Sequence, residues 1–495
     1  MSRIRVPFGV ACLLIAAHVA HAQAAHAPRS PLTASQTHGI DRLVKSEMAR
    51  QRIPGVEVGV YSRGRILLAK GYGLADVELD VPVTPETLMQ SGSVGKQFVS
   101  AAIMMLVEER KLSLDDSITK YFPDAPAGWQ PILIKNLLSH TSGLSEYESD
   151  ERTGPNGPFY LRLDFSEDQL VKKIYALPIE WAPGAKWAYR NTNYVVLGVL
   201  IHKITGERYD RFLHDRIFAP LGMTSTRLIS ERDIIKNRSS GYEIDDAGQL
   251  KNQEWVSPTF NSTADGALYF NVLDLAKWDA ALYTTRLLTQ ASLDRIWTVY
   301  PLNDGKPNPG HYGFGWMITQ FHGHKLIEHG GAWQGFTCDI SRYPDDSLSV
   351  VVLTNLDAAR SSPDVIAHVV AGLVEPALMP AKLTAIADND PAVATAVRKL
   401  LDQIVAGTDI RGQVTAELSA VVTPDAIKGV RHFLTPLWPG GTLTLVRREE
   451  APDVPGTVTS TFRIKKGANS LLIDYGRNAE GKIAVLGFSP DRDWE

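Results

Sequence analysis

The chain has 495 residues, of which 44% are hydrophobic, and its formal net charge is −4 at pH 7. This is enough apolar material for a large core and for more than one domain. Because a slightly negative chain offers no basic surface to phosphates, the composition argues against a nucleic-acid partner.

Residues 1–22 have the pattern of an export signal. Arg3 and Arg5 precede an apolar stretch, and Ala20-His21-Ala22 has the small-x-small form of a cleavage site. The apolar stretch is too short to cross a bilayer, and no later stretch is long enough. We therefore expect a periplasmic or secreted protein without a membrane span, cleaved after Ala22.

The two cysteines indicate a protein that does without disulfides. Cys12 is removed with the signal, so Cys338 has no partner within the mature chain. Cys338 lies in an alternating strand pattern, where a lone cysteine is typically a small buried apolar residue. A catalytic cysteine is the less favoured interpretation.

The predicted elements begin after an Ala-, His- and Pro-rich stretch, residues 23–35, which we expect to be a disordered leader. A short helix is predicted over residues 43–48. Two strands follow, over residues 56–61 and 66–70, joined by a hairpin turn. Farther along, the polar stretch 146–158 contains Gly and Pro and is typical of a mobile loop or lid.

The middle of the chain is mostly helical in pattern, and strands return near residue 311. Since strands lie at both ends of this region, we expect an α+β fold in which one antiparallel sheet, flanked by helices, lies beside an all-helical region. The predicted helices cover residues 165–176, 194–204 and 272–283, and the predicted strands cover 311–319, 324–328, 338–343 and 348–354.

The composition changes near residue 373, and residues 373–390 have the Pro-rich character of a linker. The remainder, residues 391–495, is predicted to be a small α+β accessory domain for binding, packing or dimerisation. Its expected helices cover 392–405 and 423–434, and its expected strands cover 442–448, 457–465, 470–474 and 483–488.

The first candidate for chemistry is Ser93-Val94-Gly95-Lys96, which opens an apolar helical run. A serine one helical turn from a lysine places a hydroxyl and an amine on one face, which suits a nucleophile with its own base. A second Ser-x-x-Lys, Ser117 to Lys120, is followed by Pro123. Because a helix there ends within a few residues, this copy is interpreted as a structural turn.

Two further motifs follow in order, Tyr189-Arg190-Asn191 before a helix and His329-Gly330-Gly331 at a strand end. Together with the Ser93 motif they resemble the serine hydrolase family of class C β-lactamases, D-alanyl-D-alanine carboxypeptidases, D-aminopeptidases and related esterases. Supporting segments are Gly71-Tyr72-Gly73-Leu74-Ala75-Asp76, Leu137-Leu138-Ser139-His140-Thr141-Ser142-Gly143-Leu144, Pro220-Leu221-Gly222-Met223 and Asp274-Leu275-Ala276-Lys277-Trp278.

The resemblance implies a β-lactamase/transpeptidase-like domain over residues 36–372, with no metal or cofactor. It implies that Ser93 is the acylated nucleophile, Lys96 its base and Tyr189 a proton relay to the leaving group. The other implied roles are electrostatic contacts or substrate binding by Asn191, His329, Gly330 and Gly331, and oxyanion stabilisation by the backbone N–H groups of Ser93 and Ala332.

His329 departs from the lysine that opens this motif in class C β-lactamases, which puts efficient β-lactam hydrolysis in doubt. Other candidates have plainer interpretations. His140 lies in a Ser/Thr-rich helix exit and is expected to be structural. His322 and His324 are expected to be solvated at a hairpin tip, and Asn271 of a second Tyr-x-Asn is expected to cap a helix.

The sequence therefore predicts an exported serine hydrolase that forms an acyl-enzyme on amide or ester carbonyls. Its expected substrates are small molecules or peptides, such as D-amino-acid peptides, cell-wall fragments or small esters. The alternative is a penicillin-recognising sensor with little or no turnover, and a third possibility is a scaffold for the C-terminal unit. The oligomeric state is left open.

Overall fold

The computed structural model describes residues 29–245, 247–379, 383–419, 422–451, 454, 456–467 and 469–491. The expected signal peptide, 1–22, and the first part of the expected leader lie outside the described residues. Residues 29–33 have no regular secondary structure, yet the Arg29 guanidinium donates to Glu375 Oε2 at 2.8 Å and to the Asp346 carbonyl at 2.8 Å. The last part of the expected leader therefore lies against the folded domain.

The larger unit is built on one seven-stranded sheet with the order β3-β2-β1-β12-β11-β10-β9, in which every neighbouring pair is antiparallel. The register of β1 against β12, with Val56 opposite Thr354, joins the two ends of the domain. This confirms the expected sheet. The strands are β1 (Gly55–Ser62), β2 (Arg65–Asp76), β3 (Val81–Pro82), β9 (Met317–Phe321), β10 (His324–Trp333), β11 (Phe336–Tyr343) and β12 (Leu348–Thr354).

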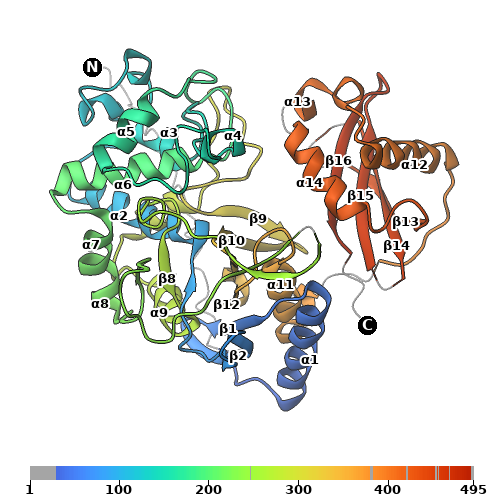
Figure 1. Ribbon diagram of the computed structural model, residues 1–495, viewed down its shortest axis with the longest axis horizontal. Helices are drawn as coiled ribbons and strands as arrows, with labels where there is room; N and C mark the ends of the chain where they lie inside the picture. The colour runs from blue at the N-terminus through green and yellow to red at the C-terminus, as the bar shows by residue number, and fades with distance from the viewer. Residues whose placement is uncertain are drawn as a thin grey trace, which may run out of the picture.

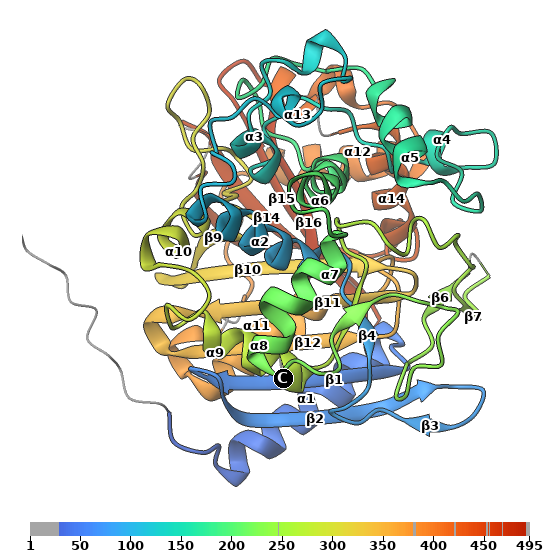
Figure 2. The same cartoon turned by 90° about the vertical axis from the view of Figure 1, so that its left-hand side faces the viewer.

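Both faces of this sheet are covered, since every residue of β1, β11 and β12 is buried. Helices α1 (Ala34–Gln51) and α11 (Pro363–Val374) pack on one face through an apolar core that includes Val44 and Ile366. Helix α9 (Val272–Ala281) lies against the other face, next to the helical region (Figure 2).

The helical region lies beside the sheet, at the upper left of Figure 1. Its central helices, α2 (Lys96–Glu108) and α6 (Asn191–Thr205), are buried over most of their length and contact one another. Surrounding helices are α3 (Ile134–Leu138), α4 (Asp150–Thr153), α5 (Glu167–Tyr175), α7 (Tyr209–Leu213), α8 (Ala219–Leu221) and α10 (Gln290–Ile296), and the short strands are β4 (Met89–Gln90), β5 (Arg227–Leu228), β6 (Tyr242–Ile244), β7 (Leu250–Asn252) and β8 (Leu268–Phe270).

Several predicted elements differ from those observed. The prediction of a strand over residues 311–319 was wrong for its first part, because β9 begins only at Met317. Before it, Gly315 has φ +77°, and a Cβ there would lie 2.9 Å from the Lys96 carbonyl oxygen, so the chain turns beneath α2. Part of the expected lid, 146–158, is packed rather than free, since Tyr147 is 1% exposed. Helix α11 was not predicted.

The C-terminal unit has its own core and lies at the right of Figure 1. Its antiparallel sheet has the order β13-β14-β15-β16, and α12 and α14 contribute to the same core. This confirms the expected small α+β unit. Its elements are α12 (Pro391–Ala406), α13 (Ala416–Ser419), α14 (Pro424–Leu434), β13 (Thr442–Glu450), β14 (Val458–Lys466), β15 (Asn469–Arg477) and β16 (Ile483–Pro490).

Within the described ranges, no helix has the length and apolar character that a bilayer crossing requires.

Candidate active site

Ser93 lies in a single turn of 3-10 helix, Gly92–Gly95, that leads directly into α2. The turn is fixed from both sides. The Ser91 hydroxyl donates to the Gly266 carbonyl at 2.8 Å, and the Cys338 thiol donates to the Ser91 carbonyl at 3.0 Å. Ser93 itself is only partly buried. Its side chain is therefore held on a rigid turn while remaining accessible to a substrate.

The Lys96 ammonium lies beside the Ser93 hydroxyl. Lys96 Nζ is 2.8 Å from Ser93 Oγ and 2.8 Å from Asn191 Oδ1, and it also donates to the Asp265 carbonyl. The side chain is 0% exposed. Burial lowers the Lys96 pKa to about 8, although the carboxylates of Asp265, Glu148 and Glu146 oppose that shift. A lysine with this pKa has a usable neutral fraction near neutral pH.

Three carboxyl groups surround the Lys96–Asn191 pair. The Asn191 backbone N–H donates to Glu146 Oε2 at 2.6 Å, and its side-chain amide donates to Glu148 Oε2. Tyr147 donates to Asp265 Oδ2 at 2.8 Å. Burial raises the pKa of Glu148 well above its usual range, and the carboxylates of Asp265 and Glu146 raise it further. Lys96 is thus surrounded by carboxyl groups, whose charge depends on burial and on one another.

Tyr189 comes from the extended segment before α6. Lys96 Nζ lies 5.0 Å from the centre of the Tyr189 ring. The phenol oxygen is buried and has no hydrogen-bond partner among the described residues. Burial raises the Tyr189 pKa well above its usual value, while the neighbouring Ser93 hydroxyl acts in the opposite direction. Tyr189 is therefore a neutral phenol next to Ser93 and Lys96.

His329 lies on β10 and is 3% exposed. Its Nδ1 is 2.6 Å from the Gly330 carbonyl oxygen, and its Nε2 is 2.9 Å from the Tyr312 hydroxyl. Because a carbonyl can only accept, the proton is assigned to Nδ1, and Nε2 accepts from Tyr312. Burial lowers the His329 pKa to about 3, with a further contribution from Lys96. His329 is thus a neutral side chain at physiological pH.

The end of β10 passes closely over the Ser93 turn. A Cβ on Gly331 would lie 2.2 Å from the Ser91 carbonyl oxygen and 3.0 Å from the Ser93 nitrogen. A Cβ on Gly92, where φ is +44°, would lie 2.2 Å from the Ala332 nitrogen. The backbone nitrogens of Ser93 and Ala332 are therefore brought to the same small region, which is the arrangement an oxyanion hole needs.

Ser93 opens onto a small pocket of about 30 Å³, bounded on one side by the segment 260–267 and on the other by the end of β10. Its lining residues include Ser93, Glu148, Asn191, Asp265, Ala332 and Trp333. The structure thus brings Ser93, Lys96, Tyr189, Asn191 and Ala332 to one place. His329, Gly330 and Gly331 precede Ala332 on β10 and are not among the residues that line the pocket.

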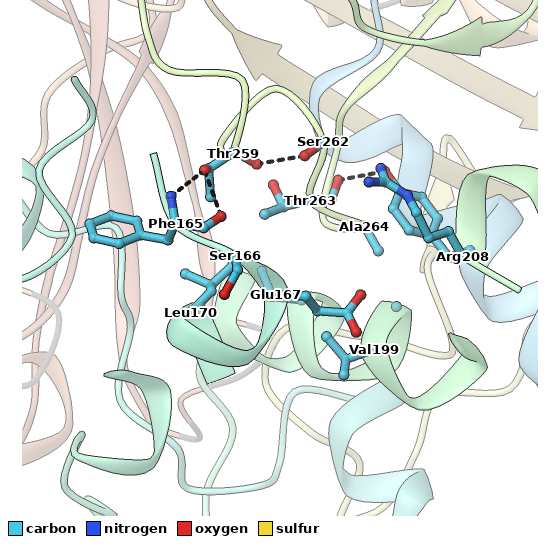
Figure 3. A pocket seen from close by; sticks show the side chains of 13 residues that line it. Phe165, Ser166, Glu167, Leu170, Val199, Arg208, Thr259, Ser262, Thr263 and Ala264 are labelled. Carbon is cyan, nitrogen blue, oxygen red and sulfur yellow. Dashed lines mark hydrogen bonds between the residues drawn. The ribbon is translucent and has the colours of Figure 1, made fainter. Parts of the chain in front are cut away.

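A second cavity of about 200 Å³ lies behind this segment, between it and helices α5 and α6 (Figure 3). Thr263 lines both hollows. Thr259 fixes the segment to the residues before α5, since its hydroxyl accepts from the Phe165 backbone N–H at 2.7 Å and donates to the Phe165 carbonyl at 3.0 Å. Near Thr263, only the segment 260–267 therefore separates the Ser93 pocket from the second cavity.

The alternative candidates have structural explanations. The Ser117 hydroxyl accepts from the Thr119 backbone N–H in a short 3-10 turn, and Lys120 pairs with Asp116, which confirms the turn interpretation. Asn271 caps α9 as expected, accepting from the Asp274 N–H at 2.9 Å. Cys338 is buried and its thiol supports the Ser91 carbonyl. Within the described ranges, no cluster of His, Cys, Asp and Glu suits a metal ion.

Sequence reasoning missed Glu148 and Asp265, which complete the surroundings of Lys96. Neither lies in one of the recognised motifs, and both reach the pocket from segments without regular structure. A signal for Glu148 was present, because Glu146-Tyr147-Glu148 begins the polar stretch that was interpreted as a lid.

Comparison with known proteins places the chain in a family. A family model described as Beta-lactamase matches residues 40–373. Penicillin-binding protein 4* of Bacillus subtilis (strain 168) is 28% identical over 309 residues, which cover 59% of this chain and 66% of that protein. Protein flp of Staphylococcus aureus (strain N315) is 26% identical over 337 residues, covering 66% of this chain and 64% of that protein. The chain thus spans slightly less than two thirds of these relatives.

Solved structures support the fold. The octameric penicillin-binding protein homologue from Pyrococcus abyssi has a TM-score of 0.62 at 23% identity, covering 90% of this chain and 94% of that chain. D-amino acid amidase from Ochrobactrum anthropi SV3 has a TM-score of 0.57 at 24% identity, covering 65% of this chain and 91% of that chain. Because the family model matches more than half of the chain, the chain belongs to the Beta-lactamase family.

Proposed function

We propose that this protein hydrolyses amide or ester bonds through an acyl-enzyme on Ser93. Neutral Lys96 takes the proton from Ser93 Oγ as that oxygen bonds to the substrate carbonyl carbon. The resulting oxyanion accepts hydrogen bonds from the backbone N–H groups of Ser93 and Ala332. The leaving group departs with a proton relayed by Tyr189, and water then attacks the acyl-enzyme by the reverse proton path.

The observation that carries this proposal is the buried Lys96 ammonium, 2.8 Å from Ser93 Oγ, with a pKa lowered to about 8. A lysine with a solvated, structural role would remain a cation and would not need a cavity beside a reactive hydroxyl. The paired geometry therefore favours a base that takes up and releases a proton.

The charges around the pocket favour neutral or cationic substrates. His329 is neutral where class C β-lactamases carry a lysine, and Glu148 and Asp265 line the pocket. Among the described residues that line the pocket, Glu148 and Asp265 carry carboxyl groups and none is a lysine or arginine, so a substrate carboxylate close to Ser93 would find no permanent cation in that lining. We therefore propose D-aminoacyl amides, peptides with a free ammonium group and small esters as first substrates, ahead of β-lactams. The likeness in fold to a D-amino acid amidase supports the same choice.

Replacement of Ser93 tests the assignment. Ser93→Ala is expected to abolish labelling by a fluorophosphonate probe and to reduce hydrolysis of D-aminoacyl p-nitroanilides and p-nitrophenyl esters by about 10³-fold or more. Ser117→Ala is a matched control, because Ser117 lies in the second Ser-x-x-Lys and should leave both readouts unchanged. Labelling that persists in Ser93→Ala, or disappears in Ser117→Ala, would contradict the proposal.

The same panel separates the hydrolase from a sensor. A sensor would acylate once and give a burst equal to the enzyme concentration without further product. Steady release of many equivalents of p-nitroaniline per enzyme would support the hydrolase. Export of the mature chain remains a further proposal that rests on the signal-like pattern of residues 1–22.

A further inference from the structure

His140 holds the segment that carries Tyr189 at two points. The His140 backbone carbonyl accepts from the Ala188 N–H at 3.1 Å, and its ring Nδ1 accepts from the Arg190 N–H at 3.2 Å. These donors are the residues immediately before and after Tyr189. The backbone of Tyr189 is thus fixed on both sides by one residue.

The His140 ring is also placed for contact with the Tyr189 ring. The two ring centres are 4.3 Å apart and the planes are tilted by 33°. The Tyr312 ring centre is 4.6 Å from that of His140 and 6.0 Å from that of Tyr189, and the Tyr312 hydroxyl donates to His329 Nε2. His140, Tyr189 and Tyr312 therefore form one cluster of rings in mutual contact, with the His329 ring beside it.

The protonation of His140 is fixed by its partners. Since the Arg190 N–H can only donate, Nδ1 must be unprotonated, which assigns the proton to Nε2. Asn193 Nδ2 also lies 3.2 Å from Nδ1 and is itself held by the Ser142 hydroxyl, 2.6 Å from Asn193 Oδ1. Burial lowers the His140 pKa well below its usual value, and Lys96 adds to this shift. The ring stays a neutral acceptor.

His140 adopts this position at a cost. Its φ is +59°, in the left-handed region, where histidine is found more often than most residues that carry a side chain. Its Nε2 is buried and finds no hydrogen-bond partner among the described residues, which is an energetic cost. Glycine and asparagine also adopt this conformation, so the backbone turn alone does not require an imidazole at position 140.

We infer that His140 is a positioning residue that holds Tyr189 in the orientation needed for proton transfer to the leaving group. This rests on the proposed hydrolase function and on the relay role of Tyr189. The Tyr189 ring is packed against His140, Tyr312 and His329, but its oxygen has no hydrogen-bond partner among the described residues. The position of that oxygen relative to Ser93 therefore depends on the ring contacts and on the backbone of residues 188–190, both of which involve His140.

The test compares two substrates with one acyl group, a D-aminoacyl p-nitroanilide and the matching p-nitrophenyl ester. The anilide must be protonated to leave, whereas p-nitrophenolate leaves without a proton. Tyr189→Phe should therefore lower kcat for the anilide more than for the ester, by about 10²-fold in their ratio. His140→Gly, which suits φ +59°, and His140→Phe, which keeps the ring, both remove the acceptor and should lower the ratio by about tenfold or more.

His140→Asn is expected to restore the ratio to within about threefold of wild type, because its Oδ1 replaces Nδ1 and asparagine tolerates the left-handed region. In the Tyr189→Phe background, His140→Gly should cause no further change in the ratio. Leu137→Ala, in the same segment but buried elsewhere in the core, is the stability control and should lower Tm without changing the ratio.

The outcomes separate the two proposals. If Tyr189→Phe leaves the ratio unchanged, the relay role is wrong and the inference on His140 fails with it. If Tyr189→Phe lowers the ratio but His140→Gly and His140→Phe slow both substrates equally, or the double variant loses as much again, only the inference on His140 is overturned.

Discussion

At the scale of single residues, the central feature is the charged form of Lys96, which hydrogen bonds stabilise and burial destabilises within the same small region. Its ammonium donates to Ser93, Asn191 and the Asp265 carbonyl, yet its burial favours the neutral amine. The carboxyl groups nearby keep the Lys96 pKa from falling further. The lysine is thus balanced between the two protonation states that a base must pass through.

The pH dependence of acylation follows from this balance. Since the neutral amine is the active form in the proposed mechanism, the rate of Ser93 labelling should rise about tenfold per pH unit below pH 8 and level off above it. Labelling by a fluorophosphonate, followed from pH 5.5 to pH 10, measures this directly. Because the His329 pKa is about 3, no inflection from His329 is expected in that range.

The Asp265→Asn variant tests whether the pH profile of labelling reports the Lys96 pKa. The Asp265 carboxylate is the largest of the charges that raise the Lys96 pKa, so its removal should move the midpoint of the labelling profile to lower pH. A midpoint that stays fixed, or that moves upward, would show that the profile reports a group other than Lys96.

The sequence predicts the candidate residues that lie in recognisable motifs, but not the residues that surround them in the fold. The pairing of Ser93 with Lys96 could be predicted because the two residues are one helical turn apart, and Asn191 was included because its motif resembles that of a known family. Glu148 and Asp265 could not be predicted, because their approach to Lys96 depends on the path of irregular segments. The neutrality of His329 was equally hidden, since its lowered pKa results from burial and from the nearby Lys96, and both depend on the folded structure.

At the scale of elements, the close approach of β10 to the Ser93 turn is the contact that would form the proposed oxyanion hole. A strand edge can come this near to another backbone only where side chains are absent. The two glycines of the motif are not equivalent in this respect, because a Cβ on Gly330 would meet only the Cys338 carbonyl oxygen, at 3.7 Å.

Replacement by alanine is therefore expected to affect kcat/KM strongly at Gly331 and only weakly at Gly330. Gly331→Ala should lower kcat/KM by about 10²-fold or more, because its Cβ would push the strand away from Ser91 and Ser93. Gly330→Ala should leave kcat/KM within about threefold of wild type, since 3.7 Å is an ordinary contact. Steady-state kinetics on a p-nitrophenyl ester, with circular dichroism to verify folding, measures both. Equal losses would mean that the strand edge does not set the site geometry.

Element prediction failed where burial is complete. Helix α11 is buried at nearly every position, so it has no polar face and no stripe that periodicity could detect. The start signal was present in Ser362-Pro363-Asp364, with proline in the first turn. In contrast, helix α12, half covered by its own small sheet, was found almost to its ends.

At the scale of the whole molecule, the larger unit extends slightly beyond the boundary expected at residue 372. Val374 and Leu378 are buried in the core between the sheet, α1 and α11. The C-terminal unit has a separate core built from residues 397–483. A truncation placed between the two cores should therefore leave the core of the larger unit intact.

Truncation tests this boundary. A chain ending at Met379 should retain Ser93 labelling and a Tm close to that of the full chain's larger unit, since both buried residues remain. A chain ending at Gly372 loses them and should unfold at a lower temperature, by several degrees. Differential scanning calorimetry and fluorophosphonate labelling report the two properties. Loss of labelling in the longer fragment would show that the C-terminal unit contributes to the site.

The pairing of β1 with β12 has a consequence for when the protein becomes active. The proposed nucleophile, Ser93, comes from the early part of the chain, whereas the strand edge proposed to stabilise the charged intermediate comes from the late part. A partial chain that ends before β10 would contain Ser93, Lys96 and Tyr189 but would lack Ala332 and the glycine that passes over the Ser93 turn. Under the proposed mechanism, hydrolysis therefore requires that nearly the whole of the larger unit has been synthesised and its sheet closed.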